Sequence, residues 1–250
     1  MKKKLVATLA CRNQGTRLYG KPLQNLDIEK NISILQYMVD WLKTMKVVDE
    51  IGLAVSDGKD NLVFADFAKK ASIAHIIGDE EDVLGRLIQC ADNLKATDIL
   101  RLTTESPFTY FEAIEDAWSK HVKEGCDLTC LDNVPDGSGF EIIKLDAYKY
   151  SHQHGEEKHR SEYCSLYIRE NKSKFKLNYV EVPVEIKRTD IRLTVDYPED
   201  LILCRAIYQR FKDKAPKIPL KEIIVFLDEQ PRLKELVAGF VEEGIKTMYL

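Results

Sequence analysis

Short apolar segments alternate with helical segments along the first half of this 250-residue chain. Residues 5–10 carry no charge and are typical of a buried strand. Strands separated by helices of about 10–15 residues favour a parallel, doubly wound sheet. The predicted strands are 5–10, 50–56, 73–77, 98–103 and 126–131, and the predicted helices are 32–45, 61–71, 82–94 and 111–122.

The alternation ends after residue 131, where a Pro-Asp-Gly-Ser-Gly turn covers 135–139. The pattern then predicts strands at 140–145 and 174–185 with a helix over 160–171 between them, which indicates a small antiparallel insertion over 135–188. Residues 191–195 are predicted to return to the main sheet, followed by a helix over 197–211 and, within 212–250, two more helices separated near Pro231. We expect one α/β domain over residues 1–250 with a mostly parallel, doubly wound sheet.

The loop after the first strand, residues 11–23, carries two glycines and three cations. Glycine lets backbone N–H groups curl around an anion, and Arg12, Arg17 and Lys21 add fixed positive charge. A strand that ends in such a loop favours a polyphosphate site at the carboxyl edge of an α/β sheet. The spacing fits neither the Walker loop nor the GxGxxG fingerprint, and an ordinary basic surface loop remains the alternative.

Two carboxylates follow predicted strands directly. Glu105 comes after the strand that ends at residue 103, and Asp196 comes after the strand over 191–195. Carboxylates at the carboxyl ends of neighbouring parallel strands can converge on one hard cation such as Mg²⁺. The alternatives are a helix N-cap for Asp196 and a solvated loop acid for Glu105.

Two charged clusters are weaker candidates. An acidic turn, 80–82, precedes Arg86, which could lie over a ligand or belong to an ordinary charged helix start with Asp82 as its first residue. The sequence Lys-His-Arg-Ser-Glu over 158–162 could hold an anionic substrate through His159, Arg160 and Glu162, and a solvated helix terminus is the alternative.

Composition excludes several classes of protein. The net charge is −4 with a sequence pI of about 5.8, which argues against a nucleic-acid binder. No segment approaches the roughly 18 apolar residues of a membrane span, and the short apolar run after Met1 argues against a secretory signal. The six cysteines are scattered, which is typical of reduced, buried thiols in a cytoplasmic protein.

Five motifs in order resemble those of the cytidylyltransferases that make CMP-activated acid sugars, such as the acylneuraminate and Kdo cytidylyltransferases. The closest similarity is to spore coat polysaccharide biosynthesis SpsF-like proteins. The motifs are Ala-Cys-Arg-Asn-Gln-Gly-Thr-Arg-Leu-Tyr-Gly-Lys over 10–21, Glu-Glu-Asp-Val-Leu-Gly-Arg over 80–86, Arg-Leu-Thr-Thr-Glu-Ser-Pro over 101–107, the segment 160–168, and Leu-Thr-Val-Asp-Tyr-Pro-Glu-Asp-Leu over 193–201. Together they cover roughly residues 4–211.

The resemblance implies a Rossmann-like nucleotidyltransferase fold and a role for each matched position. Arg12 and Lys21 are the implied catalytic residues, Glu105 and Asp196 the Mg²⁺ ligands, and 135–188 the acceptor-binding or dimerisation insertion. The implied nucleotide-binding residues are Ala10, Arg12, Asn13, Gly15, Thr16, Arg17, Lys21, Arg86 and Thr103. The implied acceptor-binding residues are Glu141, His159, Arg160 and Glu162.

The implied reaction is transfer of CMP from CTP to an acidic acceptor, normally a 2-keto acid sugar, with release of pyrophosphate in glycan biosynthesis. The implied partners are CTP, the acceptor and a second copy of the chain, with no nucleic acid and no membrane. Two positions depart from the family pattern: Thr104-Glu105 replaces Gly-Asp, and Tyr19 replaces Pro. A non-sugar acceptor (a phosphonate or a polyol phosphate) and a nucleotide-binding protein that has lost its metal site therefore remain alternatives.

Overall fold

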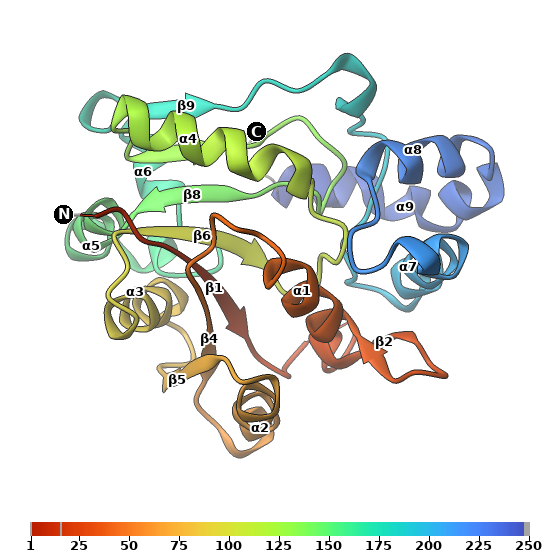
Figure 1. The fold of residues 1–250 in the computed structure, drawn as a ribbon, viewed down its shortest axis with the longest axis horizontal. Coiled ribbons are helices and arrows are strands. Elements are labelled where there is room, and N and C mark those ends of the chain that lie inside the picture. The colour runs from red at the N-terminus through yellow and green to blue at the C-terminus, as the bar shows by residue number, and fades with distance from the viewer. Residues whose placement is uncertain (1, 16, 248–250) are drawn as a thin grey trace.

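The computed structural model describes residues 2–15 and 17–247, and a seven-stranded sheet forms its centre (Figure 1). The strand order is β5-β4-β1-β6-β8-β7-β9, with β8 the antiparallel strand between β6 and β7. The strands are β1 Leu5–Cys11, β4 Glu50–Ser56, β5 Ala74–Gly78, β6 Asp98–Thr103, β7 Leu128–Cys130, β8 Glu141–Lys144 and β9 Leu177–Tyr179. The mostly parallel α/β sheet is as predicted, and the antiparallel element lies inside it.

Two layers of helices cover the sheet. The helices are α1 Ile34–Leu42, α2 Leu62–Ala71, α3 Val83–Asn93, α4 Ile114–Glu124, α5 Leu145–His154, α6 Leu166–Glu170, α7 Pro198–Phe211, α8 Leu220–Asp228 and α9 Pro231–Thr247. Alternate residues of β1 enter opposite cores: Leu5 and Leu9 pack with α1 and α7, whereas Val6 packs with α3 and α5. Burial on both faces explains why the strands read as continuous apolar segments.

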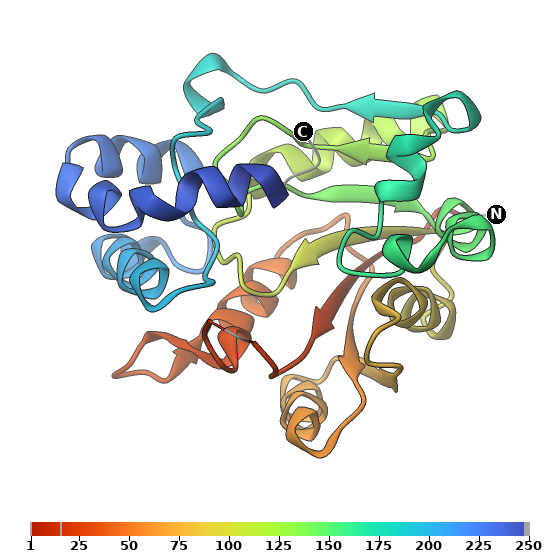
Figure 2. The same cartoon turned by 180° about the vertical axis from the view of Figure 1, so that it is seen from behind.

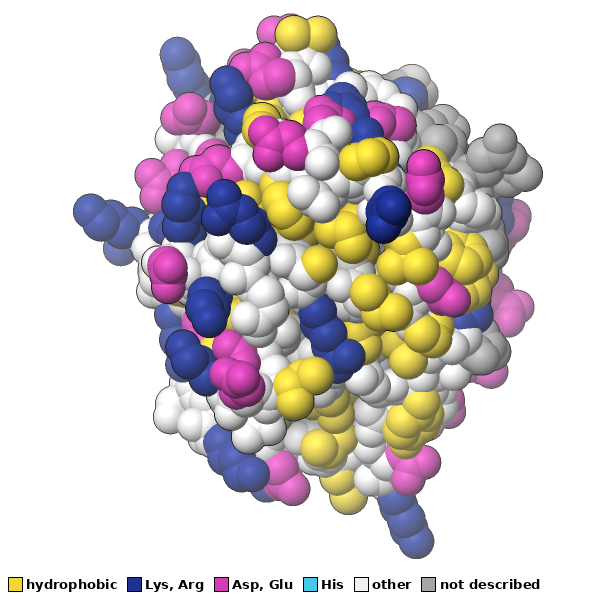
Figure 3. All heavy atoms as spheres, turned by 90° about the vertical axis from the view of Figure 1, so that its right-hand side faces the viewer, with side chains coloured by type: hydrophobic (Ala, Val, Ile, Leu, Met, Phe, Trp, Pro, Cys, Tyr) yellow, Lys and Arg dark blue, Asp and Glu magenta, His cyan; other side chains and the backbone are white. Residues whose placement is uncertain are grey.

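Helices α7, α8 and α9 gather at the end of the sheet to which β1 and β6 point (Figures 1 and 2). The surface at this end carries apolar side chains beside lysines and arginines (Figure 3). Its helices hold the exposed residues Ile202, Val225 and Leu236. A two-stranded hairpin, β2 Asn25–Asp27 with β3 Ile32–Ser33, packs against α7. The carboxyl edge of the parallel strands is therefore partly enclosed by the C-terminal third of the chain.

Several elements differ from the prediction. Residues 191–195 form no strand in the main sheet, because only one bridge, Asp136 to Arg192, joins them to another segment. The predicted strand over 174–185 is reduced to β9, and the predicted helix over 160–171 is reduced to α6. Helix α5 was not predicted, because it starts directly at the end of β8 with no turn residue to mark the change.

Gly137 permits a close backbone approach at the turn that follows β7. Its φ is +88°, and an added Cβ would lie 2.6 Å from the backbone nitrogen of Thr194. A side chain there would collide with backbone that cannot move aside, so glycine is required. This turn places residues 136–139 beside the segment that ends at Asp196.

No helix in the described ranges is long and apolar enough to cross a bilayer.

Asp98, the first residue of β6, connects this strand to α4 and to Lys3 at the edge of the sheet opposite the carboxyl ends of the parallel strands. It is fully buried, with Oδ1 3.1 Å from Nε2 of His121 on α4 and Oδ2 3.0 Å from Nζ of Lys3. Burial opposes the charge on Asp98, but hydrogen bonds from His121, Thr97 and Lys3 outweigh this effect and lower the pKa of the carboxyl group.

We expect Asp98→Asn to lower the free energy of unfolding by about 2 kcal/mol at neutral pH, because hydrogen bonds to a buried charge are lost. Since the pKa of Asp98 is lower in the folded state, its contribution is complete above the unfolded pKa of about 3.9 and is lost as the pH falls below that value. Urea unfolding at pH 7 and pH 3 measures the free energy of unfolding of the wild type and the variant.

Asp92→Asn, which removes an exposed pair with Lys149, is the control. Equal losses in the two variants at pH 7 would contradict the assignment.

Candidate active site

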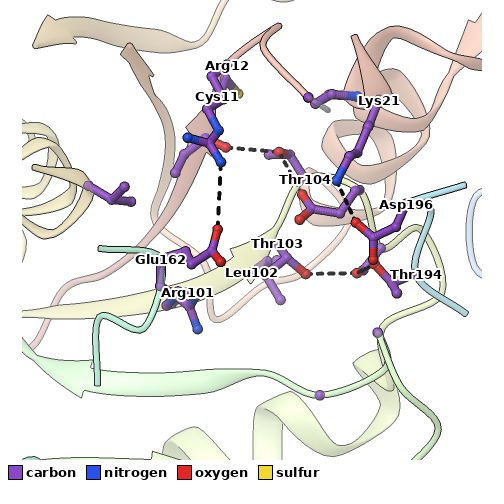
Figure 4. A pocket seen from close by; sticks show the side chains of 18 of the residues that line it. Cys11, Arg12, Lys21, Arg101, Leu102, Thr103, Thr104, Glu162, Thr194 and Asp196 are labelled. Carbon is purple, nitrogen blue, oxygen red and sulfur yellow. Dashed lines mark hydrogen bonds and ion pairs between the residues drawn. The ribbon is translucent and has the colours of Figure 1, made fainter. Parts of the chain in front are cut away.

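A cavity of about 840 Å³ opens at the carboxyl ends of β1 and β6 (Figure 4). Four segments line it: the loop after β1, the loop after β6, the turn that leads into β8, and the stretch that ends at Asp196. The structure brings together most of the predicted site residues, namely Ala10, Arg12, Asn13, Gly15, Arg17, Lys21, Arg86, Thr103, Glu105, Glu141, Glu162 and Asp196. Thr16 lies outside the described residues.

The loop after β1 is held in a fixed curve. The backbone N–H of Asn13 donates to Oδ1 of the buried Asn61 at 2.7 Å, and the carbonyl of Asn13 accepts from the N–H of Gly20 at 2.9 Å. Gly15 has no room for a side chain, because an added Cβ would lie 2.4 Å from the carbonyl oxygen of Leu18. Asn61 was missed by the sequence analysis, since nothing in its local pattern links it to a loop 48 residues away.

Lys21 and Arg17 reach from this loop to Asp196. The Lys21 Nζ lies 2.5 Å from Oδ1 of Asp196, and Nη2 of Arg17 lies 3.4 Å from the same oxygen. Figure 4 shows Lys21 pointing down to Asp196 across the cavity. Burial opposes the charge on Asp196, but Lys21 and Arg192 outweigh it and lower the pKa of Asp196, so this carboxylate is ionised.

Arg192 holds the far side of Asp196. Its guanidinium is buried and contacts Asp196 at 2.6 Å, Asp136 at 2.6 Å and Asp200 at 2.9 Å. Asp200 also accepts the backbone N–H groups of Asp196 and Tyr197, each at 2.9 Å. The N-cap alternative for Asp196 is wrong, because α7 begins at Pro198 with Tyr197 as its N-cap. Arg192 was missed, although a cation within a predicted apolar strand was a usable signal.

Glu105 lies beside Asp196 because their backbones are joined. The carbonyl of Glu105 accepts the N–H of Val195 at 3.0 Å, and the hydroxyl of the preceding Thr104 donates to the carbonyl of Ala10 at 2.9 Å. Burial raises the pKa of Glu105, Lys21 lowers it and the charge of Asp196 raises it further, with a net upward shift. Two carboxylates and one ammonium group therefore share this corner of the cavity.

Asp196 and Glu105 can bind a hard cation only if a phosphate supplies further oxygen ligands. No group of three or more His, Cys, Asp or Glu side chains in the described part of the chain is arranged to hold a metal by itself. Asp196 and Glu105 supply two oxygen donors, and Mg²⁺ normally takes one or two carboxylates and completes its shell with phosphate oxygens and water. The donor set therefore fits a metal that enters with a polyphosphate.

Arg86 lies at the floor of the cavity. It is buried, with Nη1 2.8 Å from the carbonyl of Glu80, and its Nε has no hydrogen-bond partner in the structure. Burial and the nearby charge of Arg12 lower its pKa. Asp82 starts α3 as predicted, since its Oδ1 accepts the N–H of Gly85 at 2.7 Å. A buried cation with an unused donor is suited to an anionic ligand.

Arg12, directly after β1, and Thr103, at the end of the neighbouring strand β6, border the same cavity. Arg12 is half exposed, and its Nη2 lies 3.7 Å from Oε2 of Glu162, which faces it in Figure 4. The hydroxyl of Thr103 donates to Ser106 at 2.8 Å, and Ser106 donates to Thr194 at 3.1 Å. This short chain of hydroxyl groups links the mouth of the cavity to the segment of Asp196.

The predicted acceptor-binding residues divide into two groups. Glu162 is exposed at the cavity, and Glu141 is buried in it, where Arg101 at 3.1 Å and Arg169 at 2.9 Å lower its pKa against the effect of burial. Arg101 also donates to the carbonyl of Glu162 at 2.7 Å. Arg101 was given no role from the sequence, although a cation inside an apolar strand was a signal.

His159 and Arg160 do not line the cavity. The Nδ1 of the buried His159 accepts the N–H of Glu156 at 2.8 Å, and its Nε2 lies 2.8 Å from Glu170. Arg160 donates to the carbonyl of His152 at 3.2 Å. Through these contacts, His159 and Arg160 hold the segment before α6 in place. Of the cluster over 158–162, Glu162 alone lines the cavity.

Comparison with known proteins identifies the family of the chain. The profile of the family described as Cytidylyltransferase matches residues 7–240. An uncharacterized protein of Methanocaldococcus jannaschii is 28% identical over 233 residues, which cover 93% of this chain and 94% of that protein. The spore coat polysaccharide biosynthesis protein SpsF of Bacillus subtilis is 28% identical over 225 residues, which cover 89% and 93%.

Two solved structures share the fold. A cytidylyltransferase from Leptospira borgpetersenii superposes with a TM-score of 0.81 at 20% identity, covering 93% of this chain and 96% of that one. A CMP:2-keto-3-deoxy-manno-octonic acid synthetase complexed with CTP gives 0.62 at 16% identity, covering 83% and 99%. The chain thus has the nucleotidyltransferase fold and belongs to the cytidylyltransferase family of nucleotidyltransferases.

Proposed function

We propose that this chain transfers CMP from CTP to an acidic sugar of the 2-keto acid type, with release of pyrophosphate, in the biosynthesis of a surface polysaccharide or glycan. The contact between Lys21 and Asp196 carries the proposal. It supports the proposal because a cation of a kind that binds phosphate lies beside an ionised carboxylate of a kind that binds a metal, at the carboxyl edge of the parallel strands.

The reaction balances as a displacement at phosphorus. An acceptor hydroxyl oxygen forms a bond to the α-phosphorus of CTP, the bond from that phosphorus to the α,β-bridging oxygen breaks, and pyrophosphate leaves with the bonding electrons. The hydroxyl proton passes to water. Catalysis of this kind rests on positioning and on neutralising negative charge.

The residues of the loop after β1 bind the triphosphate. Arg12, Arg17 and Lys21 neutralise it and stabilise the departing pyrophosphate, while the backbone of 13–15 curves around it. Arg86 lies below, with its free Nε available to the nucleotide. When the phosphates arrive, Lys21 exchanges its carboxylate partner for a phosphate oxygen, which releases Oδ1 of Asp196.

Asp196 and Glu105 are the residues that would hold Mg²⁺. The ion supplies charge neutralisation at the phosphates and lowers the pKa of an attacking hydroxyl group. Glu reaches further than the Asp of the family pattern, so Glu105 would hold the ion at a shifted position or through water. Burial raises the pKa of Glu105, and a bound divalent cation would lower it.

The acceptor is proposed to bind between Glu162, Arg101 and the turn before β8, where the cavity continues beyond the loop after β1. The polysaccharide role named for SpsF and the acid sugar named for the solved synthetase support an acid sugar as acceptor. The six buried free thiols fit the cytoplasmic location that we propose. The homodimer remains a prediction, which sedimentation of the purified chain tests.

We expect CTP with Mg²⁺ at 100 times its Kd to stabilise the folded chain by about 2.7 kcal/mol. Lys21→Met should weaken CTP binding about 10- to 100-fold, because a charge-assisted hydrogen bond to phosphate is lost. Asp196→Ala should remove the dependence on Mg²⁺. Thermal unfolding with and without each ligand measures both effects.

The matched control is Lys43→Met, because Lys43 is exposed and donates to the carbonyl of Ala71 away from the cavity. CTP binding that is independent of Mg²⁺ and survives Asp196→Ala would instead favour a nucleotide-binding protein without catalysis.

We expect pyrophosphate release with CTP, and not with ATP, GTP or UTP, when a 2-keto acid sugar is supplied with Mg²⁺. Glu105→Gln should lower kcat/KM about a hundredfold and Glu105→Asp should lower it less, because only the second keeps a carboxylate. A coupled pyrophosphate assay against acid sugars, polyol phosphates and phosphonates measures this. Glu124→Gln on the exposed end of α4 is the control, and unchanged release in Glu105→Gln would exclude Glu105 from the metal site.

A further inference from the structure

The C-terminal helix α9 reaches the site through a stack of three side chains. Phe240 of α9 stacks on Tyr197, with ring centroids 4.0 Å apart and planes 9° from parallel. The guanidinium of Arg17 lies over the Tyr197 ring, 4.8 Å from its centroid. Since Phe240 fills one face of that ring at contact distance, Arg17 occupies the other.

Tyr197 is a fixed platform for this stack. Its backbone N–H donates to Oδ2 of Asp200 at 2.9 Å, and Asp200 is held by Arg192 at 2.9 Å. The Tyr197 hydroxyl lies 3.3 Å from Nη1 of Arg17. One side chain therefore offers Arg17 both a ring face and a hydroxyl group.

Arg17 needs such support because its side chain is partly exposed and lies in a loop. Its side chain is 38% exposed, and the described residues between Cys11 and Lys21 form no helix or strand. Its Nη2 contacts Asp196 at 3.4 Å, a contact that must loosen when phosphate binds. The ring of Tyr197 can hold the guanidinium near the cavity before and after that exchange, because a cation–π contact engages the face of the guanidinium and not its N–H groups.

We propose that Phe240 is a positioning residue for nucleotide binding: through the ring of Tyr197, it holds Arg17 ready for the terminal phosphates of CTP. This inference rests on the proposed function. It assigns to α9, none of whose described side chains lines the cavity, a role in affinity for the phosphates. Phe240 is half-buried, and it packs against the large hydrophobic core as well as on the ring of Tyr197.

The experiment is a double-mutant cycle on binding. Calorimetry measures the Kd of CTP with Mg²⁺, and of inorganic pyrophosphate with Mg²⁺, for the wild type, Phe240→Leu, Arg17→Gln and the double variant. Phe240→Leu keeps apolar bulk but removes the aromatic face. We expect it to weaken both ligands about two- to tenfold in the wild-type background, the range of a cation–π contact, and to have no effect once Arg17 is replaced.

Two further variants separate positioning from packing. Phe240→Tyr retains the aromatic ring and should bind CTP and pyrophosphate with wild-type affinity. Leu236→Ala removes an exposed apolar side chain of the same helix and should change neither Kd. Thermal unfolding confirms that each variant is folded.

Equal weakening by Phe240→Leu in both backgrounds, or no weakening in the wild type, would overturn the inference while leaving the proposed function intact. Failure of the wild type to bind either ligand would overturn the proposed function and this inference together.

Discussion

The buried guanidinium of Arg192 is the interaction on which the rest of the site depends. It joins three carboxylates that come from different parts of the chain: Asp136 from the turn after β7, Asp196 from the end of the cavity segment, and Asp200 from the first turn of α7. Removing it would take the cation away from the largely buried carboxylates Asp136 and Asp200, which is far more costly than the loss of an exposed pair. Residues 191–195 are held by this cluster together with backbone hydrogen bonds to Asp136 and Glu105.

The same cluster explains the charge state of the cavity. Asp196 is ionised because Arg192 and Lys21 approach it from two sides, while Glu105 nearby has a raised pKa. Burial favours neutral carboxyl groups, and only opposite charge at contact distance reverses that preference. Two acids in one cavity therefore differ in their affinity for protons, because Lys21 and Arg192 contact Asp196 directly whereas burial dominates at Glu105.

The sequence predicted what depends on local pattern. Strands β4 and β6 have the predicted bounds, because each is a short run of alternating or continuous apolar residues bounded by polar ones. Arg12, Lys21 and Glu105 meet in one cavity because they follow the parallel strands β1 and β6, which end at one edge of the sheet. Asp196 joins them for a reason that the sequence did not predict, a backbone hydrogen bond between Val195 and Glu105. His159 and Arg160 were misplaced because their contacts, to Glu170 and to the carbonyl of His152, come from packing around α6 that no local pattern records.

Strand β8 has a consequence for how such a site changes over time. Glu141 on β8 is the direct cross-strand neighbour of Arg101 on β6, and the two form an ion pair. The spacing between the side of the cavity next to β1 and the side next to β8 is thus set by the register of two hydrogen-bonded strands. A slip of one residue would turn Glu141 to the opposite face of the sheet. Insertions in the surface loops do not change this register. The loops can therefore diverge in sequence and bind new acceptors, while the paired strands keep the spacing across the cavity constant.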